Sequence, residues 1–309
     1  MQQRRTFLAA SAAATFAAAA VNAAPARKTA SRFASGRLAL SDGTELFVKD
    51  WGAGRPVILT HAWPLNADCW DQQALALAEA GFRVIAYDRR GFGRSSQPDA
   101  GYDYDTFADD LAQVIAATGA RDATLAGFSM GGGEIVRYLS RHGGRGVAKI
   151  ALVGSVVPGI ARGPRNPQGV PPEFFEGLKS SLREDRVSFF QGLLRDVFYD
   201  VSAAGTFKVT QAVLDWSWQQ AMQAGLRALV QSVDAFGKVD FRSELAGIEL
   251  PTLVLHGTAD KPVPIDLTGR QAAAGIRQAR LVEYAGVSHG LLVTERDRVT
   301  RDLLEFVRS

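Results

Sequence analysis

A short apolar run that ends in a glycine-flanked serine constrains this 309-residue chain more than any other feature. Residues 123–127 have the length and composition of a buried strand, and they lead through Phe128-Ser129-Met130 into three successive glycines. A Gly-x-Ser-x-Gly pattern in this context places the serine on a sharp turn between strand and helix, where crowded backbones leave no room for β-carbons. The helix N-terminus behind Ser129 favours developing negative charge. We therefore predict that Ser129 is a catalytic nucleophile.

The rest of the chain alternates strand-like and helix-like segments. Residues 37–40 and 45–50 flank an Asp-Gly turn and predict an opening hairpin. Largely apolar runs of strand length follow at 56–60, 83–87, 123–127, 149–154, 251–256 and 280–284. Helical patterns lie at 69–80, 104–118, 131–142, 267–274 and 295–307. The alternation predicts an α/β fold with a mostly parallel, doubly wound sheet covered by helices.

The alternation stops between Val156 and Leu245. This segment opens with five prolines between Pro158 and Pro172, and continues with helical, aromatic-rich sequence. We interpret residues 156–245 as a helical cap inserted into a core made of residues 35–155 and 246–309. Most of the aromatic side chains are expected to pack the cap on the core, and a few are expected to face the substrate.

Residues 1–23 have the pattern of an export signal. Arg4 and Arg5 precede an Ala-dominated apolar run that ends in Val21-Asn22-Ala23, a small-residue cleavage pattern. Paired arginines before a weakly hydrophobic segment are typical of twin-arginine signals, and about 16 mostly Ala residues are short for a membrane span. We expect the twin-arginine export machinery as a partner, a periplasmic or secreted location, and no stable membrane insertion.

The charge balance excludes some classes of partner. Removal of residues 1–23 takes away two of the 35 basic residues and none of the 32 acidic ones, so the net charge falls from +3 to about +1. This gives no electrostatic case for binding nucleic acid. The single cysteine, Cys69, cannot form an internal disulfide, so stability must come from the core.

A serine nucleophile needs a histidine base that is itself held by a carboxylate. In folds that carry the serine on such a turn between strand and helix, the chain order is serine, acid, histidine. His289 follows the last predicted strand and precedes the last helix, where the base is expected. Asp260 follows the preceding strand and is our candidate acid. Asp266 is the alternative, although it adjoins a predicted helix.

The other three histidines have structural interpretations. His61 and His256 stand at strand ends, where we expect them to hydrogen-bond backbone near the site. His142 ends a helix, where a cation suits the helix dipole. No closely spaced ligand pair indicates zinc, so we expect neither a metal nor a cofactor. The Gly-x-Gly at residues 91–93 lacks the third glycine of a dinucleotide fingerprint and is expected to form a supporting turn.

An oxyanion formed during attack needs two backbone N–H groups. The residue after the nucleophile, Met130, supplies one of them in this kind of site. The other comes from the loop after the strand at 56–60, which runs His61-Ala62-Trp63-Pro64. We choose Trp63, because Pro64 has no N–H to donate.

Five blocks of sequence together resemble one family. They are residues 60–65, 86–95, 127–132, 256–260 and 288–290. The set is similar to the cofactor-free, non-heme bacterial chloroperoxidases and their aryl esterase and perhydrolase relatives. The resemblance covers about residues 35–308, and the spacing of all five blocks is specific.

The resemblance implies an α/β-hydrolase fold and a cofactor-free serine hydrolase. Such enzymes cleave small, often aromatic or short-chain carboxylic esters through an acyl-enzyme. With a carboxylic acid and hydrogen peroxide they make peracids, which oxidise halide without further enzymatic help.

Residue by residue, the sequence matches most of the family pattern. The triad positions carry Ser129, Asp260 and His289, and the oxyanion positions carry Trp63 and Met130. Pro64 matches the branch associated with perhydrolysis. Ala62 departs from the pattern, since glycine is usual there, and an added methyl narrows the choice of backbone conformation.

Other functions remain open from sequence. A lactone or a hydrolytically cleaved C–C bond would suit the same triad, and a non-catalytic ligand-binding protein would suit the same fold. Relatives that open halides or epoxides use an aspartate nucleophile, and Ser129 argues against both. The natural substrate and the oligomeric state do not follow from the sequence.

Overall fold

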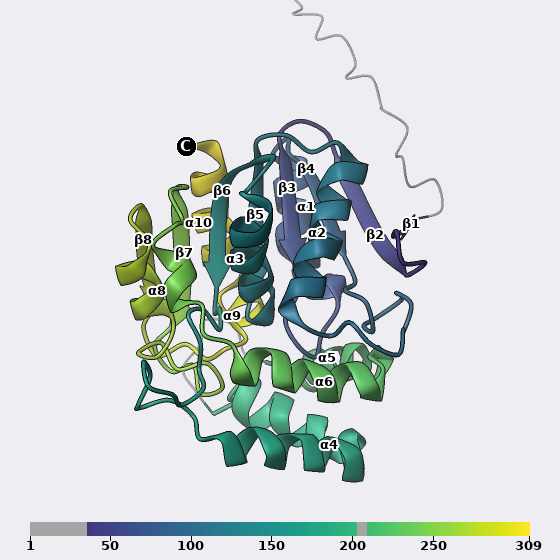
Figure 1. Ribbon diagram of the computed structural model, residues 1–309, viewed down its shortest axis with the longest axis vertical. Coiled ribbons are helices and arrows are strands. Elements are labelled where there is room, and N and C mark those ends of the chain that lie inside the picture. Colours follow the sequence, from purple (N-terminus) through teal and green to yellow (C-terminus); the bar gives the residue numbers. More distant parts are fainter. Residues whose placement is uncertain (1–35, 203–208) are drawn as a thin grey trace, which may run out of the picture.

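The computed structural model describes residues 36–202 and 209–309, so the predicted export signal lies outside the described residues. Within them, eight strands form one sheet in the order β1-β2-β4-β3-β5-β6-β7-β8 (Figure 1). The strands are β1 (Arg37–Ala39), β2 (Glu45–Gly52), β3 (Pro56–Thr60), β4 (Arg83–Tyr87), β5 (Ala123–Phe128), β6 (Val147–Val153), β7 (Thr252–Gly257) and β8 (Ala279–Tyr284). Only the pairs of β1 with β2 and of β2 with β4 are antiparallel among these strands. The predicted α/β fold with a mostly parallel sheet is confirmed.

Helices cover both faces of the sheet. The core helices are α1 (Asp71–Glu79), α2 (Tyr104–Thr118), α3 (Met130–His142), α8 (Gly269–Gly275), α9 (Leu291–Thr294) and α10 (Arg296–Arg308). Helices α2 and α3 lie side by side on one face, and α1 and α10 lie together on the other (Figure 1). Strands β3, β5 and β7 are buried almost throughout, as their apolar sequences predict.

The opening hairpin is confirmed, and one predicted helix differs in detail. Leu38 pairs with Leu46 across the Asp-Gly turn. The helix expected at 69–80 instead begins as a 3₁₀ turn, η1 (Ala67–Trp70), and becomes α1 only at Asp71. Asn66 explains the early start, because its side-chain oxygen accepts a hydrogen bond from the Asp68 N–H and so caps the turn.

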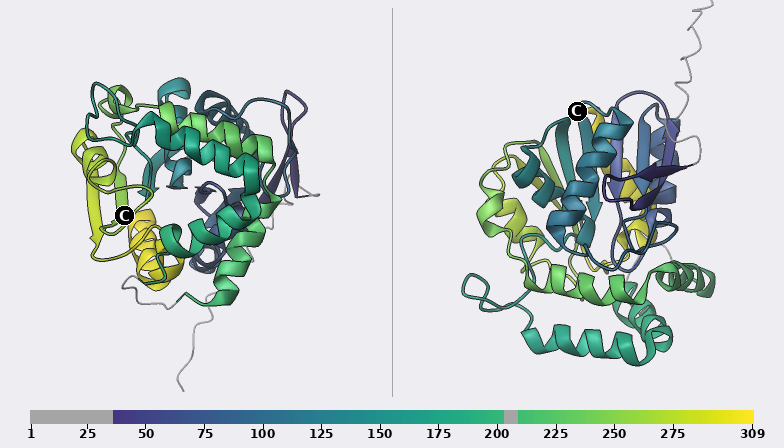
Figure 2. Two further views of the ribbon diagram at one scale, coloured as in Figure 1. Left: turned by 90° about the horizontal axis from the view of Figure 1, so that it is seen from below. Right: turned by 45° about the vertical axis from the view of Figure 1, so that its right-hand side comes forward.

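The segment between β6 and β7 is helical and crosses the carboxyl ends of the parallel strands (Figures 1 and 2). Its elements are α4 (Pro172–Gly192), the π-helix η2 (Leu193–Phe198), α5 (Gln211–Gln223), α6 (Leu226–Lys238) and α7 (Arg242–Leu245). The proline-rich entry contains two isolated bridges, Ala161 with Val170 and Gly163 with Asn166. The exact boundaries of core and cap stay a prediction.

Polar contacts join the cap to the loops of the core. The Trp63 indole N–H donates to the Leu229 carbonyl at 3.2 Å, and the Gly225 N–H donates to the Gly91 carbonyl at 2.8 Å. The cap is therefore hydrogen-bonded to the loops that follow β3 and β4, and the first of these loops carries the expected oxyanion donor Trp63. Across the described part of the chain, every helix is too short or too polar to traverse a lipid bilayer.

Candidate active site

The serine turn has the strained geometry that its sequence predicts. Strand β5 ends at Phe128 and α3 begins at Met130, with Ser129 between them at φ 56° and ψ −117°. A positive φ costs energy for any residue other than glycine, and such strain is concentrated at functional sites. A β-carbon on Gly127 would lie 2.6 Å from the Gly131 backbone, and one on Gly131 would lie 2.6 Å from the Thr60 carbonyl. Both glycines are needed for the close approach.

The candidate base and acid meet as predicted. His289 lies in the loop after β8 and Asp260 in the loop after β7, and both side chains are buried. His289 Nδ1 and Asp260 Oδ2 are 2.7 Å apart. The other carboxylate oxygen, Oδ1, accepts the Val263 N–H at 2.8 Å. A carboxylate held at both oxygens fixes the orientation of the imidazole that binds it.

A second histidine lies beside the same carboxylate. His256 Nε2 is 3.3 Å from Asp260 Oδ2, and it donates to the Val263 carbonyl at 2.8 Å. Burial raises the pKa of Asp260, but its electrostatic interaction with His289 and the hydrogen bonds from His256 and His289 outweigh this effect, so the net pKa is lowered. Asp260 is therefore the ionised partner of this cluster. The contact of His256 with Asp260 had no signal in the sequence beyond its place at a strand end.

The alternative acid lies elsewhere. Asp266 is exposed and pairs with Arg270 at 2.5 Å on the protein surface. Among the described residues, Asp266 forms no hydrogen bond or ion pair with His289, whereas Asp260 does.

Two carbonyl groups of the cap accept hydrogen bonds from the loop that carries His289. The Gly290 N–H donates to the Phe198 carbonyl at 2.9 Å, and Ser288 Oγ donates to the Tyr199 carbonyl at 2.7 Å. The imidazole of His289 lies between two phenyl rings: it stacks on Phe128 at 5.1 Å and meets Phe198 edge-on at 4.8 Å. Because Phe128 directly precedes Ser129, the first ring links the histidine to the serine turn. These cap contacts were missed from sequence, where the aromatic residues of the cap looked alike.

The backbone N–H groups of the two expected oxyanion donors are not used in secondary structure. Met130 is the first residue of α3, so its N–H has no partner within the helix. The backbone N–H of Trp63 meets no backbone acceptor among the described residues. The Trp63–Pro64 peptide is cis, and Ala62 is buried without a positive φ. Alanine is thus accommodated where the family usually has glycine.

The remaining histidines and the Gly-x-Gly segment have the predicted structural roles. His61 and His256 both contact backbone near the site, and His142 ends α3 with Nε2 2.8 Å from Asp109. Asp88 organises the glycine turn: its carboxylate accepts the N–H groups of Ala67 and Arg94. The turn therefore braces the loop that follows β3.

Neither the cysteine nor the acidic and histidine side chains form a second site of this kind in the described residues. The Cys69 thiol is buried, and burial raises its pKa, so it is not a reactive nucleophile. In residues 36–202 and 209–309, no group of three or more His, Cys, Asp or Glu side chains is arranged to hold a metal ion.

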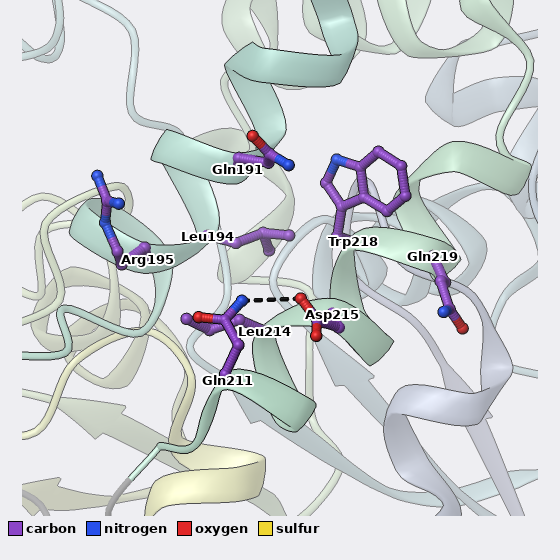
Figure 3. A pocket seen from close by; sticks show the side chains of 8 residues that line it. All are labelled: Gln191, Leu194, Arg195, Gln211, Leu214, Asp215, Trp218 and Gln219. Carbon is purple, nitrogen blue, oxygen red and sulfur yellow. Dashed lines mark hydrogen bonds between the residues drawn. The ribbon is translucent and has the colours of Figure 1, made fainter.

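A cavity of about 410 Å³ opens in the cap between α4, η2 and α5 (Figure 3). Its lining consists of Gln191, Leu194, Arg195, Gln211, Leu214, Asp215, Trp218 and Gln219. Two of these, Gln211 and Asp215, hydrogen-bond each other at 2.8 Å. The lining includes neither Ser129 nor its expected partners, so this cavity is separate from the candidate site.

Known proteins are similar to this chain over most of its length. The family model described as the alpha/beta hydrolase fold matches residues 55–295. A non-heme haloperoxidase from Rhodococcus erythropolis is 43% identical over 269 residues, which cover 87% of this chain and 98% of the relative. A bifunctional esterase/perhydrolase from Acinetobacter calcoaceticus is 39% identical and is covered over 100% of its length by 89% of this chain. Among solved structures, a bromoperoxidase from Bacillus anthracis matches with a TM-score of 0.81 at 36% identity, over 86% of this chain and 96% of that one.

Proposed function

The chain belongs to the α/β-hydrolase family, and from this premise we propose that it hydrolyses small carboxylic esters through an acyl-enzyme formed on Ser129. The resemblance of five sequence blocks to the non-heme chloroperoxidases and their relatives is confirmed at the level of the family. The observation that carries the proposal is the 2.7 Å contact between His289 Nδ1 and Asp260 Oδ2, beside the strained serine turn. An imidazole oriented by a carboxylate is what a serine needs to lose its proton at neutral pH.

The reaction follows from these roles. Ser129 Oγ attacks the ester carbon while its proton passes to His289 Nε2. The negative charge that develops on the carbonyl oxygen is stabilised by the N–H groups of Trp63 and Met130. The imidazolium, stabilised by Asp260, then protonates the departing alcohol and leaves the acyl group on Ser129. A water molecule activated by His289 attacks the acyl carbon and releases the acid.

Hydrogen peroxide is the proposed second acceptor. If peroxide takes the place of water in the last step, the same attack releases a peracid and restores the Ser129 hydroxyl. Two observations support this extension: relatives named haloperoxidase and esterase/perhydrolase, and Pro64 in the position that the resemblance associates with perhydrolysis.

The surroundings of the oxyanion loop support an apolar acyl group. The indole of Trp63 packs against the rings of Phe190 at 5.4 Å and Phe236 at 5.5 Å, and both rings belong to the cap. These apolar rings next to a proposed oxyanion donor support the proposal of an uncharged acyl group.

A fluorophosphonate probe tests the function and the nucleophile together. We expect purified enzyme to be labelled on Ser129 and to hydrolyse p-nitrophenyl acetate with a burst, and we expect Ser129→Ala to lose both. Labelling of another residue in the intact protein would overturn the site assignment. A panel of esters, lactones and β-diketones, assayed side by side, then identifies the substrate class, and faster turnover of lactones or diketones would replace the ester proposal.

We also propose export through the twin-arginine pathway, from the sequence of residues 1–23. The buried Cys69 and the large apolar core are compatible with a protein that crosses the membrane folded. Fractionation of cells that express the full chain tests this. Wild-type protein is expected outside the cytoplasm, and the variant Arg4→Lys/Arg5→Lys is expected to stay inside. Equal distribution of the two would contradict the proposal.

A further inference from the structure

A buried chain of hydrogen bonds runs behind the two expected oxyanion donors. It begins at the Arg89 N–H, which donates to His61 Nε2 at 2.9 Å. Because an N–H can only donate, Nε2 must be the acceptor, and the proton of the neutral ring must be on Nδ1. His61 Nδ1 then donates to the Ala62 carbonyl at 2.9 Å. The partners on both sides therefore select one tautomer.

The ring is also held neutral. Burial lowers the pKa of His61 well below its usual range, and the positive charges of Arg89 and Arg94 lower it further. A protonated ring would point a second N–H at the Arg89 N–H. The Nδ1–H tautomer is thus the form compatible with this site.

The acceptor of that proton belongs to a particular peptide unit. The Ala62 carbonyl and the Trp63 N–H are the two ends of one planar trans peptide, so they point in opposite directions. A donor that fixes the carbonyl therefore fixes the direction of the N–H. Hydrogen bonding at the carbonyl also polarises the amide and strengthens its N–H as a donor.

We propose that His61 is a positioning residue for this reaction: by donating from Nδ1 to the Ala62 carbonyl, it orients and polarises the Trp63 N–H toward the substrate oxyanion. The inference rests on the proposed function, because it assigns the Trp63 N–H to the oxyanion. It gives a task to a histidine that takes no part in the Ser129, Asp260 and His289 chemistry.

Arg89 extends this series of hydrogen bonds to α3, the helix that begins at the second expected oxyanion donor, Met130. Its guanidinium donates to the His61 carbonyl from Nη2 at 3.1 Å and to Glu134 Oε2 from Nε at 2.8 Å. Glu134 lies on α3, one helical turn after Met130. Both side chains of this ion pair are fully buried, and Glu134 also accepts the Tyr87 hydroxyl. One rigid unit thus connects the peptide of Trp63 with the helix that carries Met130.

Two substitutions of His61 separate positioning from packing. The side-chain amide of Asn lies near the place of Nδ1, so His61→Asn keeps a donor for the Ala62 carbonyl. The amide of Gln reaches the place of Nε2, so His61→Gln keeps an acceptor for the Arg89 N–H and loses the donor. Both replacements are polar and similar in size, and each retains one of the two hydrogen bonds that the His61 ring makes.

The readouts are acylation and affinity for an oxyanion mimic. With p-nitrophenyl acetate we expect His61→Gln to lower the acylation rate constant at least about 10-fold with KM changed less than about 3-fold, since the lost interaction exists mainly in the transition state. The inhibition constant of a phenyl trifluoromethyl ketone, which adds to Ser129 and forms an oxyanion, should rise by the same factor. His61→Asn should stay within about 3-fold of wild type in both assays. Tyr104→Phe, which removes a buried hydroxyl that has no partner among the described residues, serves as the packing control.

Failure of this inference is distinguishable from failure of the proposed function. If wild type does not hydrolyse the ester, or if Ser129→Ala still does, the proposed function fails. If wild type is active and the two His61 variants lose acylation equally, or neither loses it, His61 has only a packing role. A loss confined to KM would also overturn the inference.

Discussion

The phenyl ring of Phe198 meets the imidazole of His289 edge to face, with centroids 4.8 Å apart and planes at 88°. Phe198 is the last residue of the π-helix η2, and π-helical turns occur frequently at functional sites. The residue that ends this unusual turn therefore touches the proposed base. The cap is part of the catalytic geometry as well as a cover over it.

Replacement of that ring should slow the reaction more than it weakens substrate binding. In Phe198→Leu the imidazole loses one of its two aromatic neighbours, and we expect kcat to fall about 3- to 10-fold because small displacements of a base are costly. Phe189→Leu is the matched control, since Phe189 is in the same cap but packs on Phe190. Steady-state kinetics of both variants decide the matter, and equal losses of kcat would show a general effect of the cap.

The identity of the acid can be tested by an isosteric pair. Asp260→Asn offers an amide to His289 and favours the wrong tautomer, so we expect kcat to fall by about 10⁴. Asp266→Asn should change kcat less than about 2-fold, because Asp266 is exposed and bound to Arg270. Ester hydrolysis with matched protein concentrations measures both, and a large loss in Asp266→Asn would contradict the assignment.

Stability should depend on pH through His61. In the folded state its pKa is held well below 6.5 by burial and by Arg89, so the folded protein leaves it neutral while the unfolded chain protonates it. This contribution to stability is present above pH 6.5 and is lost as pH falls below that value, by up to about 1.4 kcal/mol per pH unit. His61→Asn removes the group, so its free energy of unfolding should fall less steeply between pH 6.5 and pH 5. Urea titrations at several pH values test this, and parallel slopes would show that His61 titrates normally.

The buried pair of Arg89 and Glu134 should behave as one unit. Arg89→Met leaves Glu134 buried without its cation and should cost about 3–5 kcal/mol. The double variant Arg89→Met/Glu134→Leu removes both charges and should recover much of that loss. Denaturant unfolding of the two single variants and the double variant gives the coupling energy. A double variant no more stable than Arg89→Met would refute the prediction.

Pro64 should affect the choice between water and peroxide. From the family resemblance we expect Pro64→Leu to lower the ratio of perhydrolysis to hydrolysis. Peracid formation from acetate and hydrogen peroxide, compared with p-nitrophenyl acetate hydrolysis in the same preparation, provides that ratio. An unchanged ratio removes the reason for placing this chain in the perhydrolytic branch.

The parts of the site that local sequence controls were predictable. The serine turn at Ser129 depends on glycines a few residues away, and the places of Asp260 and His289 follow from the strands that precede them. The contacts that refine the site were not predictable, because their partners are distant in the chain. Nothing near Ser288 indicates that it donates to Tyr199, and nothing near His61 indicates that the Arg89 N–H selects its tautomer.

The two bonds from the cap to the histidine loop both end on carbonyl oxygens, those of Phe198 and Tyr199. Substitutions in the cap therefore leave these two acceptors in place as long as η2 keeps its path. The strands on either side of the cap are also direct neighbours, with Val153 opposite Leu255. Selection can then alter which acids and alcohols are accepted by changing cap side chains, while the cap backbone continues to hold the base. Apart from Phe198, whose ring touches His289, substrate range can therefore evolve through cap side chains without moving the base.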